Sequence, residues 1–316
     1  MTNLDDLRLL RAFVRIVESG NISSAARVLN VSQPTLSRQL RQLENVVGVP
    51  LIRRDTHTMS LTQAGRTLLH DARNLLGLAE SAAERLHEDR VVPRGHIRVV
   101  SVVDFGQWIV TKVLARFCET NPEITGELHL LNRPTKFVEE GFDCGISVGE
   151  PTDKSVVARK VCTLKRHLVA SPKLLARRHT QPKSPSDLRD IPWLGILQPH
   201  FYARDRLTLH RENKSCTVTV KPVMLLDGVT ALREAARAGA GFTMLPAWLI
   251  HQELAAGVLV PILPEWTMSE LDLHVVHLPH QRLPGRVRGF VDYCLREIPV
   301  VMEDLRSCQK TSHRVA

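Results

Sequence analysis

Hydrophobic side chains in the first thirty positions recur at the spacing of short helices. Apolar residues every three or four positions over residues 7–18 predict an amphipathic helix that Ser19–Gly20 ends. An alanine-rich segment, Ser24–Leu29, predicts a second helix with Ser23 as its N-cap. Asn30 follows, and it tolerates the left-handed backbone conformation that a sharp turn needs.

A third helix is predicted directly after that turn. Ser32 is a favourable N-cap, Pro34 is tolerated in the first turn, and Gly48 provides the end. The predicted buried stripe consists of Leu36, Leu40, Leu43 and Val47. Two short helices joined by a tight turn, with another helix packed behind, predict a helix-turn-helix.

The opposite face of this third helix carries side chains that form hydrogen bonds. These are Gln33, Thr35, Ser37, Arg38, Arg41 and Gln42. Such residue types read base edges and bind phosphates, and an ordinary solvated helix more often carries Glu and Lys. A polar surface without a ligand is the alternative interpretation.

A small hairpin is predicted after the third helix. Residues 49–52 are apolar, residues 53–58 are polar and turn-forming, and residues 59–61 are mainly apolar again. Arg53 and Arg54 lie at the base of this hairpin. A wing of this kind can reach the phosphate backbone or the minor groove beside a recognition helix.

A long helix is predicted from Thr62, as its cap, to about Glu88. Its apolar and small residues alternate at intervals of four and three, the heptad pattern of a coiled-coil seam: Leu61, Gly65, Leu68, Ala72, Leu75, Ala79, Ala82 and Leu86. A helix of about 26 residues spans roughly 39 Å, longer than a small winged domain covers. The pattern therefore favours dimerisation, and packing against the chain's own domain is the alternative.

Strand and helix patterns alternate beyond the turn-rich joint at Val92–His96. The predicted strands include Ile97–Ser101, Glu127–Leu131, Cys144–Val148, His167–Ala170, Trp193–Leu197, Val223–Leu226, Phe242–Leu245, Val258–Leu263 and Leu271–Leu278. The predicted helices include Phe137–Gly141, Pro172–Arg177, Thr230–Ala238 and Val287–Glu297. This alternation predicts a parallel α/β sheet, in which ligands bind at the carboxyl ends of strands.

Composition and charge add two constraints. The chain of 316 residues is 43% hydrophobic and 24% charged, typical of a globular protein, and it shows neither a membrane-spanning run nor a secretory signal. Its six cysteines are sparse and lack metal-binding spacing, which favours reduced thiols and a cytoplasmic location. The net charge is +9, and residues 21–70 contain six Arg against two acidic residues.

The N-terminal segment resembles the DNA-binding domain of the LysR-type transcriptional regulators. The resemblance rests on AARVLNVSQPTLSRQLRQLENVVGVPLIRR at residues 25–54 and on LTQAG at residues 61–65. It implies that the recognition helix contacts bases and phosphates. The expected DNA-binding residues are Ser23, Ser32, Gln33, Pro34, Thr35, Ser37, Arg38, Arg41, Gln42, Arg53 and Arg54.

The C-terminal part resembles the effector domain of the same family more loosely, through EGFDCGISVG, ASPKLLARR, AARAGAGFTMLP and GVLVPILP. The resemblance implies two α/β subdomains joined by two crossing strands, like a periplasmic binding protein, with a small-molecule effector in the cleft. The expected effector-binding residues are Ser101, Val102, Asn132, Arg133, Gln198, His200, Phe201, Tyr202, Asp227, Gly228 and Thr230. Ser101 with the following helix N-terminus suits a carboxylate or another anion, and Arg133 would reinforce this preference.

These observations predict a chain of several parts. Residues 1–61 would form an all-α winged helix-turn-helix domain, 62–92 a dimerising linker helix, 93–305 the effector domain and 306–316 a tail. Within the effector domain, subdomain I would comprise residues 93–165 and 270–305, and subdomain II residues 166–269. The expected partners are double-stranded DNA, a small-molecule effector, further copies of the chain as a homodimer or homotetramer, and RNA polymerase, with no membrane.

Neither a catalytic site nor a metal or cofactor site is predicted. Gly145–Gly149 has the GxSxG spacing of serine hydrolases, but the following loop cannot start the helix that this chemistry requires. His274 and His277 would point to opposite faces of a strand. The competing class is an enzyme or solute-binding α/β protein whose N-terminal helices serve only for dimerisation.

Overall fold

The computed structural model describes residues 6–54, 59–85, 93–178, 181–197, 205–279 and 283–307. Its internal contacts divide the chain into two compact units. The first comprises Met1–Val92, Val138–Gly141 and His280–Gly285, and the second comprises Pro93–Phe137, Phe142–Pro279 and Arg286–Ala316. Each unit contains its own hydrophobic core.

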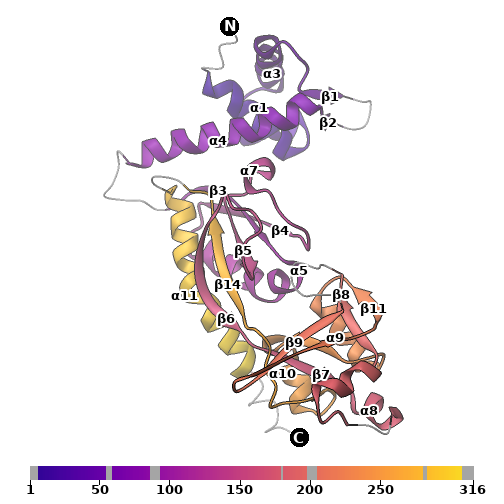
Figure 1. The fold of residues 1–316 in the computed structure, drawn as a ribbon. Coiled ribbons are helices and arrows are strands. Elements are labelled where there is room, and N and C mark those ends of the chain that lie inside the picture. The colour runs from indigo at the N-terminus through magenta and orange to yellow at the C-terminus, as the bar shows by residue number, and fades with distance from the viewer. Residues whose placement is uncertain are drawn as a thin grey trace, which may run out of the picture. The chain divides into compact units, whose positions relative to one another are not determined.

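The first unit begins with the helices that the hydrophobic spacing predicts (Figure 1). These are α1 (Leu7–Ser19), α2 (Ile22–Val28) and α3 (Gln33–Val47). Gly20 ends α1 with a φ of 70°, and Asn30 makes the tight turn between α2 and α3 with a φ of 52°. The predicted turn chemistry is confirmed at both positions.

The residue that caps α2 differs from the prediction. The side chain of Asn21, and not that of Ser23, accepts a hydrogen bond from the Ser24 N–H at 2.8 Å. Both residue types make good N-caps, and the extended backbone of Asn21 places its side-chain oxygen over the first turn. At α3 the prediction is confirmed, because Ser32 Oγ accepts from the Thr35 N–H at 3.3 Å.

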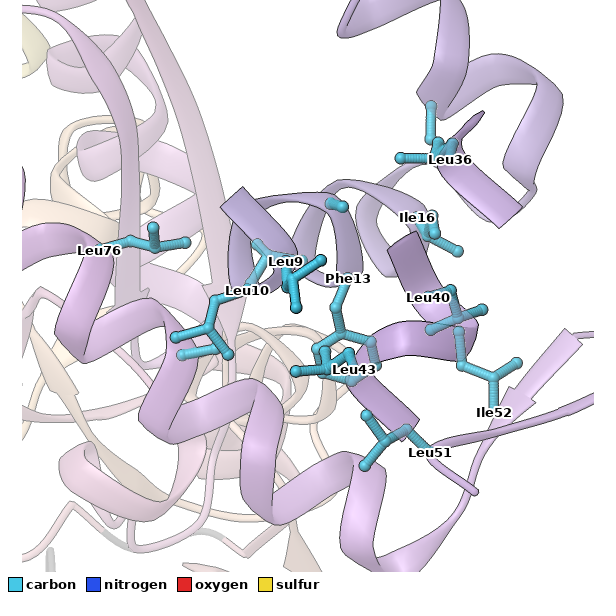
Figure 2. Close-up of a cluster of buried hydrophobic side chains, with 14 of the residues drawn as sticks. Leu9, Leu10, Phe13, Ile16, Leu36, Leu40, Leu43, Leu51, Ile52 and Leu76 are labelled. Carbon is cyan, nitrogen blue, oxygen red and sulfur yellow. The ribbon is translucent and has the colours of Figure 1, made fainter. Parts of the chain in front are cut away.

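The inner faces of α1 and α3 meet in one hydrophobic core (Figure 2). Leu36, Leu40 and Leu43 of the predicted stripe are at most 1% exposed, whereas Val47 is partly buried. Burying one leucine side chain contributes about 1.5–3 kcal/mol. The same core includes residues from α1 and from the segments after α3: Leu9, Leu10, Phe13, Ile16, Leu51, Ile52, Ala72 and Leu76.

The predicted wing is an antiparallel pair of strands. β1 (Ile52–Arg54) pairs with β2 (Met59–Leu61), and the connecting turn lies outside the described residues. Glu44, near the end of α3, accepts hydrogen bonds from the Leu51 N–H at 2.9 Å and from the Ile52 N–H at 3.3 Å. Its carboxylate therefore attaches the first strand of the hairpin to α3.

The helix α4 (Gln63–Arg85) follows the wing. Thr62 acts as the predicted cap, since its Oγ1 accepts from the Gly65 N–H at 2.9 Å and donates to the Pro50 carbonyl at 2.8 Å. A Cβ atom at Gly65 would lie 2.1 Å from the Leu51 carbonyl oxygen. Glycine at this position therefore lets α4 start directly against the wing.

In the first half of α4, the residues of the heptad stripe pack into the hydrophobic core of the same chain. Ala72 is fully buried there and Leu68 is partly buried against the same core. Leu76, outside the predicted stripe, also joins this core, whereas Leu75 is 43% exposed. Of the rest of the stripe, the side chain of Ala82 and all of Leu86 lie outside the described residues.

The second unit contains, in its described part, a five-stranded sheet in the order β4-β3-β5-β14-β6. Its strands are β3 (Gly95–Ser101), β4 (Ile124–Leu130), β5 (Cys144–Val148), β6 (Val157–Leu164) and β14 (Leu271–His277). β4, β3 and β5 run parallel, but β14 pairs antiparallel with both β5 and β6. The prediction of a parallel sheet is therefore wrong in part, because β14, a predicted strand from the far end of the chain, enters between β5 and β6 and runs antiparallel to both. β6 is absent from the predicted strands.

Helices flank this sheet, which we call the β3 sheet. They are α5 (Val103–Phe105), the π-helical turn η1 (Gly106–Val110), α6 (Thr111–Thr120) and α11 (Gly285–Ser307). The short helix α7 (Phe137–Glu140) belongs mostly to the first unit. Arg159 on β6 donates to Asp292 on α11 at 2.8 Å. We use the name subdomain I for the β3 sheet together with α5, η1, α6 and α11.

The remaining strands of this unit form smaller sheets, in the orders β12-β7-β13, β11-β8 and β10-β9. They are β7 (Arg166–Ala170), β8 (Trp193–Ile196), β9 (Arg206–Arg211), β10 (Lys214–Thr219), β11 (Pro222–Leu226), β12 (Thr243–Pro246) and β13 (Val260–Pro261). Their helices are α8 (Pro172–Arg178), η2 (Pro185–Asp190), α9 (Val229–Arg237) and α10 (Ala247–Ala255). We call this group subdomain II, and Figure 1 shows the paired strands β6 and β14 running toward it from the β3 sheet.

Candidate functional site: a nucleic-acid interface and a ligand cleft

The exposed face of α3 holds the residues that the sequence predicts. Gln33, Pro34, Thr35, Arg38, Arg41 and Gln42 are exposed, and Ser37 is half-buried. Most of them line one shallow hollow on the surface: Gln33, Pro34, Ser37, Arg38 and Arg41. The burial of the leucines opposite explains why these polar side chains share one face.

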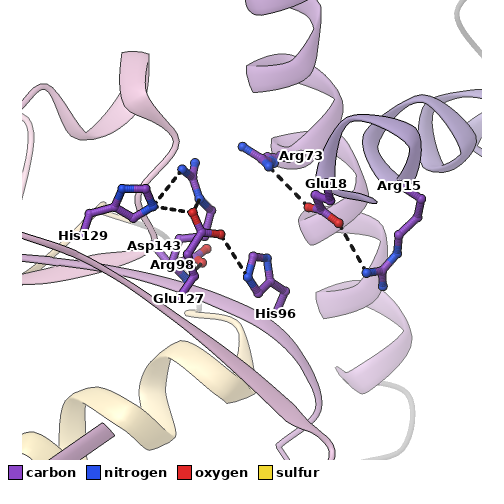
Figure 3. Close-up of polar contacts among 8 residues, drawn as sticks. All are labelled: Arg15, Glu18, Arg73, His96, Arg98, Glu127, His129 and Asp143. Atoms are coloured by element: carbon purple, nitrogen blue, oxygen red, sulfur yellow. Dashed lines mark hydrogen bonds and ion pairs between the residues drawn. The ribbon is translucent and has the colours of Figure 1, made fainter. Parts of the chain in front are cut away.

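The arginines of this face differ from Arg15 of α1 and Arg73 of α4. Within the described residues, neither Arg38 nor Arg41 has an acidic partner, while Glu18 binds both Arg15 and Arg73 at 3.3 Å (Figure 3). The Glu18–Arg73 pair attaches α4 to α1. The guanidinium groups on α3 are therefore available to phosphates and base edges.

The four remaining predicted DNA-binding residues lie elsewhere in the first unit. The Ser32 hydroxyl shares a hydrogen bond of 2.7 Å with the Thr35 hydroxyl, so both are engaged within the helix cap. Ser23 is exposed in the first turn of α2, and Arg53 is exposed on β1. The side chain of Arg54 lies outside the described part of the structure.

A cavity of about 60 Å³ lies between subdomains I and II. Four of the predicted effector residues line it: Val102, Asn132, Asp227 and Gly228. Apolar side chains cover much of the remaining wall: Phe105, Val148, Leu164, Ile196, Val229, Pro246, Trp248 and Leu271. The volume has room for about four to six water-sized groups.

One carboxylate from subdomain I reaches the N-terminus of α9 in subdomain II. Asp104, which is 9% exposed, accepts hydrogen bonds from the Val229 N–H at 2.7 Å and from the Thr230 N–H at 3.3 Å. Gly228 has a φ of 105°, and a Cβ atom there would lie 2.7 Å from Asp104 Oδ2. Asn132 accepts from the Val103 N–H at 3.0 Å and so fixes the start of α5.

Sequence reasoning missed Asp104. It expected Asp227, Gly228 and Thr230 to face a bound anion, and it assigned no partner from the same chain. The available signal was an acidic residue in the first turn of the helix after the first strand, where a carboxylate is stable near backbone N–H groups. Linking it to Thr230 required the tertiary structure.

Ser101 and Arg133 line a different cavity, within subdomain I, of about 70 Å³. Ser101 is 2% exposed and its hydroxyl donates to the Val102 carbonyl at 3.2 Å. Arg133 donates to the Pro134 carbonyl at 3.2 Å. The remaining predicted positions, Gln198, His200, Phe201 and Tyr202, lie outside the described residues.

A charged network covers β3 and β4 of subdomain I (Figure 3). Glu127 binds His96 at 3.1 Å and Arg98 at 3.1 Å, and it also binds His129. Partial burial raises the pKa of Glu127, but the hydrogen bond with His129 and the charge of Arg98 outweigh it, so this pKa lies below its usual value. Burial raises the pKa of the neighbouring Asp143 carboxyl.

The features that invited an enzymatic interpretation have structural roles. Ser147 lies within β5, paired with β14, and not on a turn between a strand and a helix. Burial raises the pKa of the Cys144 and Cys294 thiols, which disfavours reactive thiolates. Among the described residues, no group of His, Cys, Asp or Glu side chains is arranged to hold a metal ion, and no helix there is long and apolar enough to span a membrane.

These parts together define a class of protein: a winged helix-turn-helix joined to a two-subdomain α/β domain that contains a ligand cavity. Residues 7–66 match the family described as bacterial regulatory helix-turn-helix protein, lysR family, and residues 90–299 match the LysR substrate binding domain. The chain belongs to the LysR family of transcriptional regulators. It is therefore a DNA-binding regulator with an effector-binding domain, and not an enzyme.

Individual relatives agree with this assignment. The HTH-type transcriptional regulator PtxR of Pseudomonas aeruginosa is 30% identical over 295 residues, covering 92% of each chain. The full-length structure of AphB, a virulence activator of Vibrio cholerae, is 26% identical with a TM-score of 0.57, covering 92% of this chain and 98% of that chain. CrgA of Neisseria meningitidis has the same identity and coverage, with a TM-score of 0.58.

Proposed function

We propose that this regulator binds specific DNA sequences through the exposed face of α3, with Gln33, Ser37, Arg38 and Arg41 in the major groove and Arg53 of the wing against the backbone. The observation that carries this proposal is the absence of acidic partners for Arg38 and Arg41 among the described residues. Arginine forms bidentate hydrogen bonds with guanine and with phosphate. Other arginines of the same unit already bind Glu18.

We propose that two copies of the chain bind DNA together through α4, as a dimer that can pair into a tetramer. The exposed Leu75 supports this arrangement, and so does the heptad spacing of Ala79, Ala82 and Leu86 in the sequence. The positions up to Ala72 contribute to the fold of each copy. Two recognition helices would then enter successive major grooves, about 34 Å apart. RNA polymerase is a further proposed partner.

We propose that a small effector, a carboxylate or another anion, binds in the cavity between subdomains I and II. The support is the N-terminus of α9, whose N–H groups already hold a carboxylate beside that cavity. Effector binding would change how the subdomains close, and so the DNA bend that a dimer imposes. The proposed boundaries are 1–61 for the DNA-binding domain, 62–92 for the linker and 93–305 for the effector domain.

The Arg38→Ala variant tests the DNA interface. We expect operator affinity to fall by about fivefold to 150-fold, as for loss of one base or phosphate contact worth about 1–3 kcal/mol. Binding is measured at several salt concentrations by fluorescence anisotropy, on DNA selected by footprinting. Arg206→Ala, an equal charge change on β9, is the control and should bind like the unmodified protein. Equal affinity of both variants would refute the assignment of α3.

A further inference from the structure

The anion site of the effector cleft is occupied by the chain itself. The Asp104 carboxylate accepts from two successive N–H groups at the start of α9, at 2.7 Å and 3.3 Å. Three aligned features make this site suitable for an anion: amides that point outward, the positive end of the helix dipole, and a glycine, Gly228, that leaves room for the oxygens. Asp104, Gly228 and Val229 all line the cavity.

The site has hydrogen-bonding capacity that Asp104 does not use. The Thr230 hydroxyl oxygen is buried and has no hydrogen-bond partner in the structure. A buried hydroxyl without a partner costs about 1–3 kcal/mol. Thr230 does not line the cavity itself, but its N–H group binds Asp104 and the preceding Val229 lines the cavity. We infer that an anion which replaces the Asp104 carboxylate and carries a further acceptor oxygen binds these amides and also this hydroxyl.

The segment that carries Asp104 also holds the two subdomains together. The ring of Phe105 contacts the Trp248 ring edge-on, at 5.6 Å between centroids. Trp108, on the π-helical turn, lies 5.9 Å below the Arg233 guanidinium, which also approaches Glu253 at 3.6 Å. Removal of the Asp104 carboxylate from α9 would therefore weaken one of several adjacent contacts between the subdomains.

We propose that Asp104 is a built-in competitor of the effector, which binds by displacing its carboxylate from the N-terminus of α9. This inference rests on the proposed binding of an anion in the cleft. Asp104 then determines specificity in two ways. Anions that form no more hydrogen bonds than one carboxylate does are excluded. Binding of an effector in the cleft also releases a contact between the subdomains.

The test uses formate and acetate as probes, with the full-length chain and thermal unfolding as the readout. Asp104→Ala should melt at a lower temperature than the unmodified protein, and formate should raise that temperature in a saturable manner at constant ionic strength, by replacing the missing carboxylate. Chloride is the reference salt. The unmodified protein should need a much higher formate concentration for the same shift, because Asp104 competes for its site.

Asp187→Ala is the matched control. Asp187 also accepts from two backbone N–H groups, those of Lys183 and Ser184 at 2.8 Å and 2.9 Å, but it lies in η2 and lines neither cavity. Its loss should lower the melting temperature without rescue by formate. Equal formate shifts in Asp104→Ala and Asp187→Ala, or in the unmodified protein, would overturn the proposal.

Asp104→Asn keeps the proposal testable if Asp104→Ala does not fold. The carboxamide fills the same space but carries no charge, so it competes less strongly for the α9 amides. We expect acetate to produce its half-maximal shift at a concentration at least tenfold lower than for the unmodified protein. An unchanged concentration would refute competition. DNA binding of the unmodified protein is measured separately. A failure of the proposed DNA-binding function can then be distinguished from a failure of the competition by Asp104.

Discussion

The two proposed binding surfaces of this protein differ in whether their polar groups already have partners in the same chain. On α3, Arg38 and Arg41 have no acidic partner among the described residues. In the cleft, the amides at the start of α9 already hold the Asp104 carboxylate. The proposed DNA surface is thus open, whereas a side chain of the same chain fills the proposed ligand site.

This difference has a physical origin in the size of the two ligands. DNA is larger than the whole N-terminal unit, so it can bind a convex helix face without any opening of the protein. A small effector must be enclosed to gain enough contact, and an enclosed polar site needs a partner when no ligand is present. The same chain therefore leaves one site exposed and fills the other.

The largest expected effect separates the two faces of α3. Leu40→Ala removes a side chain that is 1% exposed and should lower the free energy of unfolding of the N-terminal unit by about 2–5 kcal/mol. Arg41→Ala, on the outer face, should stay within about 0.5 kcal/mol while weakening operator binding. Chemical denaturation followed by circular dichroism measures both. A large loss of stability in Arg41→Ala would show that the outer face supports the fold.

Gly228→Ala tests whether the Asp104 carboxylate lies against the start of α9. The new Cβ would lie 2.7 Å from Asp104 Oδ2, at a φ of 105° that alanine rarely adopts. We expect the protein to lose about 2–3 kcal/mol of stability, through crowding and backbone strain. Calorimetry gives the loss, and Gly257→Ala, also at positive φ but with open space around it, is the control for strain alone. Equal losses in both variants would contradict crowding at Asp104.

Glu44 offers a further test on the side of the DNA surface. Glu44→Ala leaves the Leu51 and Ile52 amides without their acceptor and should cost about 1–2 kcal/mol. Operator affinity should fall as well, because the wing loses its attachment to α3. Glu44→Gln retains one acceptor oxygen and should recover most of both losses. Normal DNA binding by Glu44→Ala would exclude a positioning role.

The sequence predicts the exposed face of α3 well because the exposure of a helix face depends on local rules. The periodicity of Leu36, Leu40 and Leu43 determines which side of α3 is buried, and hence which side chains face outward. The capping residue of α2 shows the limit, since Asn21 and Ser23 are both good caps and only the backbone decides between them.

The cleft is harder to predict because its residues come from distant parts of the chain. Asp104 and Thr230 lie 126 positions apart in the sequence, and no spacing rule connects them. Val102, Asn132 and Gly228 were placed at the cavity by resemblance, whereas Ser101 and Arg133 line another cavity. The dimerisation stripe had a related problem, because a heptad pattern does not reveal whether Ala72 packs against its own domain or a second chain.

The smallest expected effect concerns Glu127. Like Asp104, it binds groups of its own chain, but its side chain is partly exposed on the surface. Its pKa is held below the ordinary 4.5 by His129 and Arg98 despite partial burial. The carboxylate therefore stabilises the fold above pH 4.5, and this contribution disappears as the pH falls through the lower folded-state value. With its side chain 33% exposed, Glu127→Gln should cost below about 1 kcal/mol at pH 7, and this difference should shrink as the pH falls below 4.5. Urea titrations from pH 3 to 8 measure this difference in the free energy of unfolding, with Glu119→Gln on α6 as the control. A difference that grew on acidification would contradict the predicted direction.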